Sequence, residues 1–260
     1  MLFDNKTIFN ALAEQYDAYR PHYPADALNF LITLGELDKG SDIADIGSGT
    51  GRIALELAPH VRTVYAVDTA AVMLAQLQTS AENTGLSNIQ LIEAPAEATT
   101  LPDHSLDLAI IAQAFHWLDK PMALQEANRI LKSHKQLAVI WNQATNTTDE
   151  YFVNMMALIK RYNPAYRGGS DIISVDFPTH FEDSTYFEPS DRYTFGFEIE
   201  YSTEEYIGFL LSKSYIGIGI AQAELPHFIE AAYQVLKASF PNGKFSEQYE
   251  TVILAAQRNG

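Results

Sequence analysis

Residues 43–141 alternate short apolar runs with segments of helical spacing, and this alternation constrains the fold more than any other feature of the sequence. Continuous apolar runs are typical of strands that are covered on both faces. The pattern therefore predicts βα units arranged around a parallel sheet. The expected strands are 43–46, 63–67, 89–92, 106–111 and 136–141, and the expected helices are 52–59, 70–83 and 120–132, the last with Asp119 as N-cap.

The flanking segments depart from this alternation. Upstream, 7–20 and 24–35 are expected to be two helices, because the prolines of RPHYP oppose helix continuation. Downstream, the regular pattern is lost after Trp141 and returns only in a strand at 251–256. We predict one elaborated domain with an N-terminal helical lid at 1–36, a core at 37–145, an inserted cap or substrate region with interspersed core elements at 146–248 and a returning strand at 249–260.

The cap is rich in tyrosine and phenylalanine, and its segment 206–220 is expected to be a helix followed by a turn that contains glycines. These aromatic residues either line an apolar pocket for a ligand or form part of an ordinary hydrophobic core.

Composition excludes several classes of partner. Acidic residues outnumber Lys and Arg by 33 to 17, the formal charge is −16, and no Lys/Arg-rich run offsets it. Nucleic acids and anionic membranes are therefore poor partners. The chain has no cysteine, its histidines lack metal-site spacing, and no segment approaches the ~20 apolar residues of a membrane span. The missing cysteines and the histidine spacing lead us to expect no metal. No secretory signal is recognised, so we expect a cytoplasmic location.

The segment IADIGSGTGRIALEL, residues 43–57, places glycines at 47, 49 and 51 between a strand and a helix. Glycine allows a tight turn with positive φ and lets a ligand approach the backbone closely. A dinucleotide fingerprint requires its third glycine at position 52, which is Arg52 in this chain. The spacing therefore argues against NAD.

Asp68 follows the second predicted strand, seventeen residues after Gly51. A carboxylate at this point can accept hydrogen bonds from both ribose hydroxyls of an adenosine group. The alternative is that Asp68 only caps the helix that starts near Ala70. In combination with the glycine turn, the ribose role is favoured.

Three more stretches, YDAYRPHYP (16–24), APAEATTLPDHSLDL (94–108) and QAFHWLD (113–119), complete a resemblance. Over about residues 8–141 the chain resembles class I S-adenosylmethionine-dependent methyltransferases, most of all the branch with the trans-aconitate and related small-molecule methyltransferases. The resemblance implies a Rossmann-like, doubly wound α/β fold with a mostly parallel, seven-stranded sheet. It also implies S-adenosylmethionine as cofactor and a small-molecule acceptor.

The resemblance also assigns cofactor contacts. Gly47 and Gly49 would lie against the methionine part, Asp45 would reach its ammonium directly or through water, and Asp68 would hold the ribose. The whole expected set is Tyr16, Arg20, Asp45, Gly47, Ser48, Gly49, Gly51, Asp68, Thr69, Met73, Ala96, Glu97, Gln113, Phe115 and Trp117.

In that set, the backbone N–H of Ala96 would meet the adenine ring and the Gln113 carbonyl would lie near the methionine amine, while Phe115 and Trp117 would help to wall the site. Many members of the family carry an acid where this chain has Pro95. Either Glu97 replaces that acid or no side chain does.

Tyr16, Arg20 and Tyr23 would lie in the lid, where the planar Arg20 guanidinium could pair with a carboxylate of the cofactor or of an acidic substrate. The alternative is a helical hairpin packed on the sheet, with Arg20 reaching solvent. On the substrate side we expect Tyr23, His116 and Trp141.

Methyl transfer depends mainly on positioning, which can be worth ~7 kcal/mol or more. A general base is needed only if the acceptor must lose a proton, and His116 is the candidate; otherwise it packs in the wall. Carboxylic acid, amine, phenol and activated-carbon acceptors remain open. Two other classes also remain open: a non-catalytic S-adenosylmethionine-binding regulatory protein and an NAD-linked oxidoreductase.

Overall fold

The structure is a computed structural model that describes residues 19–166 and 177–260, so Tyr16 and most of the expected helix 7–20 lie outside the described residues. The chain divides into two compact units. In described residues, the sheet unit comprises 23–142, 177–195 and 251–260, and the helical unit comprises 19–22, 143–166 and 196–250.

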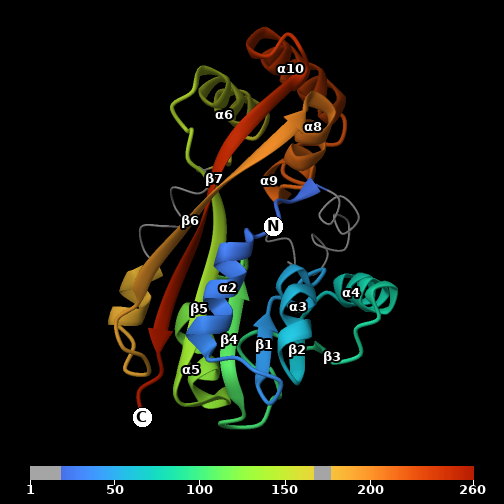
Figure 1. Cartoon of the computed structure of the whole chain (residues 1–260). Coiled ribbons are helices and arrows are strands. Elements are labelled where there is room, and N and C mark those ends of the chain that lie inside the picture. Colours follow the sequence, from blue (N-terminus) through green and yellow to red (C-terminus); the bar gives the residue numbers. More distant parts are fainter. Residues whose placement is uncertain (1–18, 167–176) are drawn as a thin grey trace. The chain divides into compact units, whose positions relative to one another are not determined.

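A seven-stranded sheet with the order β3-β2-β1-β4-β5-β7-β6 organises the fold (Figure 1). β1 pairs in parallel with β2 and β4, β2 with β3, and β4 with β5. The arrows of β6 and β7 point in opposite directions. This confirms the expected Rossmann-like, mostly parallel fold. The strands are β1 (Asp42–Ile46), β2 (Thr63–Asp68), β3 (Ile89–Glu93), β4 (Leu106–Ala112), β5 (Leu131–Ala144), β6 (Asp191–Ser202) and β7 (Lys244–Gln257).

Two apolar clusters explain the continuous apolar runs of the sheet unit. In β1, Ala44 and Ile46 belong to one cluster and Ile43 to the other, because successive side chains of a strand point to opposite faces. The helices of this unit are α2 (Ala25–Gly35), α3 (Arg52–Leu57), α4 (Ala71–Thr84) and α5 (Lys120–Ile130), with short 3-10 turns at Ala58–His60 and Phe115–Trp117. Both faces of the sheet are therefore covered, as the sequence pattern predicts.

The start of α5 matches the expectation and its end does not. Asp119 accepts a hydrogen bond from the Met122 backbone N–H at 3.1 Å, which confirms it as the N-cap. The helix ends at Ile130, two residues before the predicted 132, because Leu131 already pairs with Leu106 as the first residue of β5.

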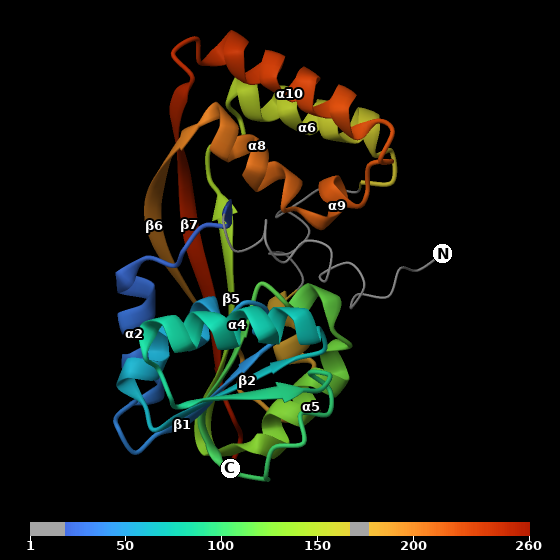
Figure 2. The same ribbon diagram turned by 90° about the vertical axis from the view of Figure 1, so that its right-hand side faces the viewer.

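The helical unit contains α6 (Glu150–Tyr162), α8 (Thr203–Leu211), α9 (Ser214–Gly217) and α10 (Leu225–Ser239). α10 packs against α6 and α8, and Figure 2 shows α6 and α10 side by side. Ser202 and Glu205 form a reciprocal capping box that starts α8. The core of this unit is strongly aromatic, with Tyr151, Tyr201, Tyr206, Phe209, Phe228, Phe245 and Tyr249.

Regular structure also occurs between Trp141 and residue 251, where the sequence shows no regular alternation. β6 lies within that interval, and β7 begins at Lys244 rather than at 251. β6 alternates exposed and partly buried residues, so its signal has a period of two and differs from the continuous apolar runs of β1 to β5. Among the described residues, no helix is both long and apolar enough to cross a membrane.

Candidate functional site

The glycine turn, residues 47–51, connects β1 to α3 in the sheet unit. The backbone N–H groups of Gly47 and Ser48 donate to the Val67 carbonyl at 2.8 and 3.0 Å, which ties the turn to β2. Gly47, Gly49 and Gly51 have φ values of 71°, 55° and 84°. The turn therefore needs glycine for its backbone conformation, as the sequence argument requires.

The three glycines differ in their surroundings. A Cβ at Gly47 would lie 2.5 Å from the Ala114 Cβ, and a Cβ at Gly51 would overlap Leu77, which is fully buried. A Cβ at Gly49 would meet no described atom within 4 Å. Gly47 and Gly51 thus allow close packing, whereas Gly49 faces open space in which a ligand can approach the backbone.

Asp68 lies against this turn. One carboxylate oxygen accepts from the Gly49 N–H and the other from the Ala70 N–H, each at 2.8 Å. The side chain therefore bonds to the start of α4 and to the glycine turn at once, so the two sequence interpretations do not exclude each other. Burial raises the pKa of Asp68, against the lowering effect of the backbone hydrogen bonds.

Asp45 is 1% exposed at the end of β1. Its Oδ2 accepts from the Ala54 N–H at 3.1 Å, whereas its Oδ1 has no hydrogen-bond partner among the described residues. Burial, with a smaller contribution from the charge of Asp68, raises the pKa of Asp45 to about 7, although the bond from Ala54 opposes this. The carboxylate is therefore desolvated, and only one of its two oxygens accepts a hydrogen bond from the described residues.

Two hydroxyls in the turn share this property. Ser48 Oγ and Thr50 Oγ1 are buried and lack a hydrogen-bond partner in the described part of the chain. Buried polar atoms are usually bonded, so unmatched oxygens this close together indicate a place where a polar ligand binds. Thr50 was not among the residues expected from the sequence. Its signal was a small polar residue between two required glycines.

The loop after β4 lies beside the turn, because Ala114 limits the space at Gly47. Gln113 has a φ of 57°, and its N–H donates to the Ile140 carbonyl at 2.8 Å. His116 and Trp117 have ring centroids 5.0 Å apart, and Trp117 is 38% exposed. Phe115 is 2% exposed and packs edge-on against Phe177, so it belongs to the core.

The loop after β3 is held by two hydrogen bonds. The Ala94 N–H donates to the Asp68 carbonyl at 3.2 Å, and Glu97 Oε1 accepts from the Asp119 N–H at 2.9 Å. Ala96, which lies between Ala94 and Glu97 in the sequence, is buried. The Glu97 carboxylate thus connects this loop to the start of α5, and its expected contact with adenine stays a prediction.

The other expected residues are more dispersed. Thr69 is exposed and Met73 is buried at the start of α4, and Trp141 is 2% exposed beside Phe177. Tyr23 packs against the core of the sheet unit. Arg20 belongs to the helical unit and donates to the Ser212 carbonyl at 3.3 Å. The cofactor and substrate roles of these residues also stay predictions.

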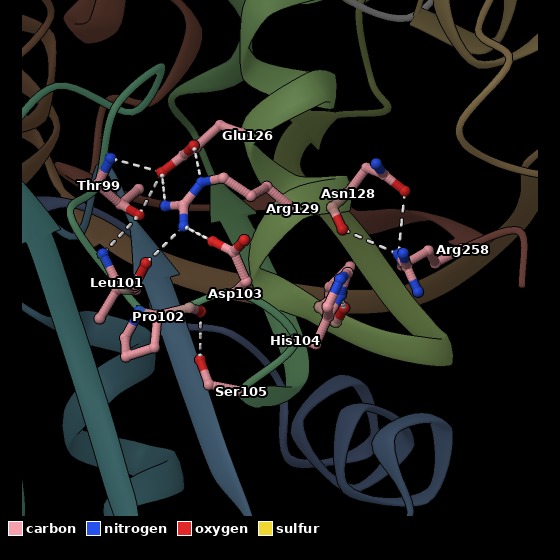
Figure 3. Close-up of polar contacts among 11 residues, drawn as sticks. Thr99, Leu101, Pro102, Asp103, His104, Ser105, Glu126, Asn128, Arg129 and Arg258 are labelled. Carbon is pink, nitrogen blue, oxygen red and sulfur yellow. Dashed lines mark hydrogen bonds and ion pairs between the residues drawn. The ribbon is translucent and has the colours of Figure 1, made fainter.

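A second polar cluster in the sheet unit borders a surface hollow beside α5 (Figure 3). Glu126 accepts from the Thr99 backbone and hydroxyl at 2.7 and 2.6 Å and from Arg129 at 2.7 and 2.8 Å. Arg129 also bonds to the Leu101 carbonyl and to Asp103. Since these groups satisfy one another, the network stabilises the loop at 99–105 rather than offering unmatched atoms to a ligand. No group of three potential metal ligands occurs in the described residues.

Comparison with known proteins connects this geometry to a family. Residues 44–139 match the family model of a methyltransferase domain. An uncharacterized methyltransferase-like protein of Schizosaccharomyces pombe is 32% identical over 145 residues, which are 55% of this chain and 54% of that relative. The chain therefore spans about half the length of this relative.

Solved structures share the fold. A proposed type II methyltransferase from Anaeromyxobacter dehalogenans has a TM-score of 0.65 at 22% identity, covering 93% of this chain and 98% of its own. A geranyl diphosphate methyltransferase in complex with S-adenosylmethionine has a TM-score of 0.52 at 13% identity, with 90% and 84% covered. At these identities the likeness concerns the fold alone. Residues 44–139, which contain the glycine turn, are therefore similar to a methyltransferase domain, and the solved structures share the fold of the chain.

Proposed function

We propose that this chain transfers the methyl group of S-adenosylmethionine to a small-molecule acceptor. The observation that carries the proposal is the glycine turn with the Asp68 carboxylate bonded to it and the buried, half-matched Asp45 below it. Keeping these two acids desolvated costs free energy, and binding of the cofactor would offset that cost.

The charges of the site favour a cationic ligand. Burial disfavours the ionised forms of Asp45 and Asp68, and the charge of Asp68 adds to this effect at Asp45. S-adenosylmethionine carries an ammonium and a sulfonium, so its binding would relieve that cost. Asp45 is the proposed partner of the ammonium, and Asp68 is the proposed acceptor for the ribose hydroxyls. Ser48 and Thr50 offer hydroxyls on either side of the open position at Gly49.

The neighbouring loops supply the rest of the proposed cofactor contacts. Ala96 and Glu97 would meet the adenine, Gln113 the methionine amine, and Trp117 would help to exclude water. Phe115 acts from the core by positioning this loop, since it is almost fully buried. Gly47, Gly51, Thr69, Met73, Arg20 and Tyr16 complete the proposed set.

When bound, S-adenosylmethionine supplies a methyl group on a sulfonium that leaves readily. The residues of the chain then have to hold the acceptor atom in line with that methyl and exclude water. Tyr23, Trp141 and His116 are the proposed acceptor contacts. If the acceptor is a hydroxyl, the His116 imidazole takes its proton as the new bond forms, whereas a protonated amine would give its proton to His116 before it attacks. A carboxylate acceptor needs no base.

We favour a carboxylic acid acceptor of the kind that the trans-aconitate branch methylates. The support for this finer assignment is the resemblance of the stretches 16–24, 94–108 and 113–119 to that branch.

Isothermal titration calorimetry tests the cofactor. We expect the full chain to bind S-adenosylmethionine and its demethylated product at micromolar or lower concentration, and Asp68→Ala to weaken both by at least about a hundredfold, as loss of a buried charge-assisted contact does. Asp26→Asn, an exposed acid in α2, is the control and should behave as wild type. Absence of heat and of a thermal shift with either compound would refute the proposal.

Turnover separates an enzyme from a protein that only binds the cofactor. Wild type should form the demethylated cofactor when incubated with a panel of small carboxylic acids, phenols and amines. His116→Gln should slow the phenol and amine reactions and spare the acids, with the exposed His60→Gln as control. Tight cofactor binding without product on any acceptor would instead favour the regulatory alternative.

A further inference from the structure

The helical unit contains a buried acid, Glu247, and a partly buried lysine, Lys213, that methyl transfer does not use. Glu247 is 1% exposed, yet its carboxylate is well satisfied. It accepts hydrogen bonds from the hydroxyls of Tyr151 at 3.1 Å, Tyr206 at 3.2 Å and Tyr249. Three phenolic donors around one carboxylate leave few of its lone pairs for a further partner.

Lys213 lies close to this acid, but in the described part of the chain its ammonium lacks hydrogen-bond partners like those of the Glu247 carboxylate. It connects α8 to α9, and its Nζ lies 4.3 Å from the centroid of the Phe209 ring and 5.9 Å from that of Tyr215. No hydrogen bond or ion pair of this ammonium is formed within the described residues. An ammonium has three donors, and aromatic faces attract its charge without replacing an acceptor oxygen.

Other groups around the Phe209 ring add to this pattern. Tyr201 is 5% exposed and its ring stacks on Phe209 at 5.8 Å, while its hydroxyl lies near that of Tyr249 but makes no well-formed hydrogen bond in the described part of the chain. The Arg20 guanidinium lies 6.0 Å from the same ring centroid. Burial, reinforced by the charge of Arg20 and opposed by that of Glu247, lowers the pKa of Lys213 to about 8. Positive charge and an unmatched hydroxyl therefore meet at one aromatic surface.

We propose that Lys213, Tyr201 and Phe209, which we call the Lys213 cluster, form a binding site for an organic anion. The ligand class is a carboxylate or a phosphate attached to a flat apolar body. The Lys213 ammonium and the Tyr201 hydroxyl would donate to the anionic oxygens, and the rings of Phe209 and Tyr215 would contact the apolar part. The site lies within the helical unit, so its existence does not depend on methyl transfer.

A purely structural role for Lys213 makes the opposite prediction for stability. If the cation is kept for its contact with Phe209, then Lys213→Met lowers the melting temperature. If the cation is kept for a ligand, the same change removes a desolvated charge, retains the apolar stem and leaves the melting temperature of the ligand-free protein unchanged or higher.

Calorimetry on the full chain with benzoate, phenyl phosphate and the neutral benzamide tests the site. We expect saturable binding of at least one anion and at least tenfold weaker binding of benzamide. Lys213→Met should weaken anion binding by at least tenfold and abolish the preference over benzamide. Tyr201→Phe should weaken it by a smaller factor, and Lys237→Met, an exposed lysine of α10, should have no effect. The tighter of the two anions identifies the natural charged group.

Three results would overturn the proposal: no saturable binding of benzoate or phenyl phosphate, equal binding of benzamide, or anion affinity unchanged in both Lys213→Met and Tyr201→Phe. Should Lys213→Met not fold, Tyr201→Phe alone decides, since it removes one unmatched atom. The proposed S-adenosylmethionine site and the proposed anion site can be refuted independently of each other. Asp68→Ala should retain benzoate binding, and Lys213→Met should retain binding of S-adenosylmethionine.

Discussion

The described residues of each unit include an acid that is only 1% exposed, Asp45 in the sheet unit and Glu247 in the helical unit, and the two acids differ in what surrounds them. Glu247 in the helical unit accepts hydrogen bonds from three tyrosines, whereas Asp45 in the sheet unit accepts one backbone bond and keeps one oxygen unmatched within the described residues. Burial alone therefore does not mark a functional acid. What distinguishes Asp45 is an unmatched oxygen beside unmatched hydroxyls and an open glycine position.

The unmatched charges of the two units also have opposite signs. The sheet unit combines two acids with raised pKa values, which suits a cationic ligand, and the helical unit holds the Lys213 ammonium on aromatic rings, which suits an anion. The contrast gives variants that should act on one unit and spare the other.

The largest expected effect comes from matched glycines of the two units. Gly51 and Gly243 both have positive φ, but only a Cβ at Gly51 would overlap a buried side chain, that of Leu77. Gly51→Ala should lower the free energy of unfolding by roughly 3 kcal/mol, from backbone strain plus overpacking, and Gly243→Ala by about 1 kcal/mol from strain alone. Urea unfolding measures both. Equal losses would show that Leu77 moves aside at little cost.

Substitutions of the two buried acids should differ in their effect on the affinity for S-adenosylmethionine. Asp45→Asn should weaken S-adenosylmethionine binding by about thirtyfold, roughly 2 kcal/mol, because the ammonium loses a buried charged partner. Glu247→Gln should leave that affinity unchanged and should instead lower the free energy of unfolding by about 2 kcal/mol, since tyrosine hydroxyls lose a charged acceptor. Calorimetry and urea unfolding on both variants measure the pair. An equal loss of affinity in both would remove the distinction.

The pH dependence of stability tests the raised pKa of Asp45. Between about pH 4 and 7 the unfolded chain has lost the Asp45 proton while the folded chain keeps it. The folded state then binds more protons, so this residue lowers the free energy of unfolding as pH rises, by at most ~1.4 kcal/mol per pH unit, and the penalty is constant above 7. In melting curves of the cofactor-free protein, Asp45→Asn should gain stability over wild type across that window. A constant difference from pH 4 to 8 would contradict the raised pKa.

The smallest expected effect compares two tyrosines of the helical unit. Tyr151 bonds to Glu247 and Asn146, whereas the hydroxyl of Tyr201 lies near that of Tyr249 but makes no well-formed hydrogen bond among the described residues. Tyr151→Phe should lower the free energy of unfolding by about 1 kcal/mol, and Tyr201→Phe should leave it unchanged or raise it slightly. Urea unfolding distinguishes the two. A loss for Tyr201→Phe as large as that for Tyr151→Phe would mean that this hydroxyl contributes to the fold rather than to a ligand site.

By itself, the sequence determined the features that depend on local chemistry. Apolar runs predicted the strands β1 to β4 to within a residue or so, Asp119 was recognised as a cap, and the glycine spacing with Asp68 predicted the turn and the carboxylate that bonds to it. These signals are local because strand alternation, capping and positive φ are properties of a few neighbouring residues.

Only the tertiary structure decided which oxygens stay unmatched and which charges meet. Tyr151 reaches Glu247 across 96 positions of sequence, and Tyr201 stacks on Phe209 from a strand that the sequence pattern did not reveal. The unmatched oxygen of Asp45 likewise depends on how distant segments pack around it. Local patterns cannot encode them, because hydrogen-bond satisfaction and desolvation depend on every segment that surrounds a group.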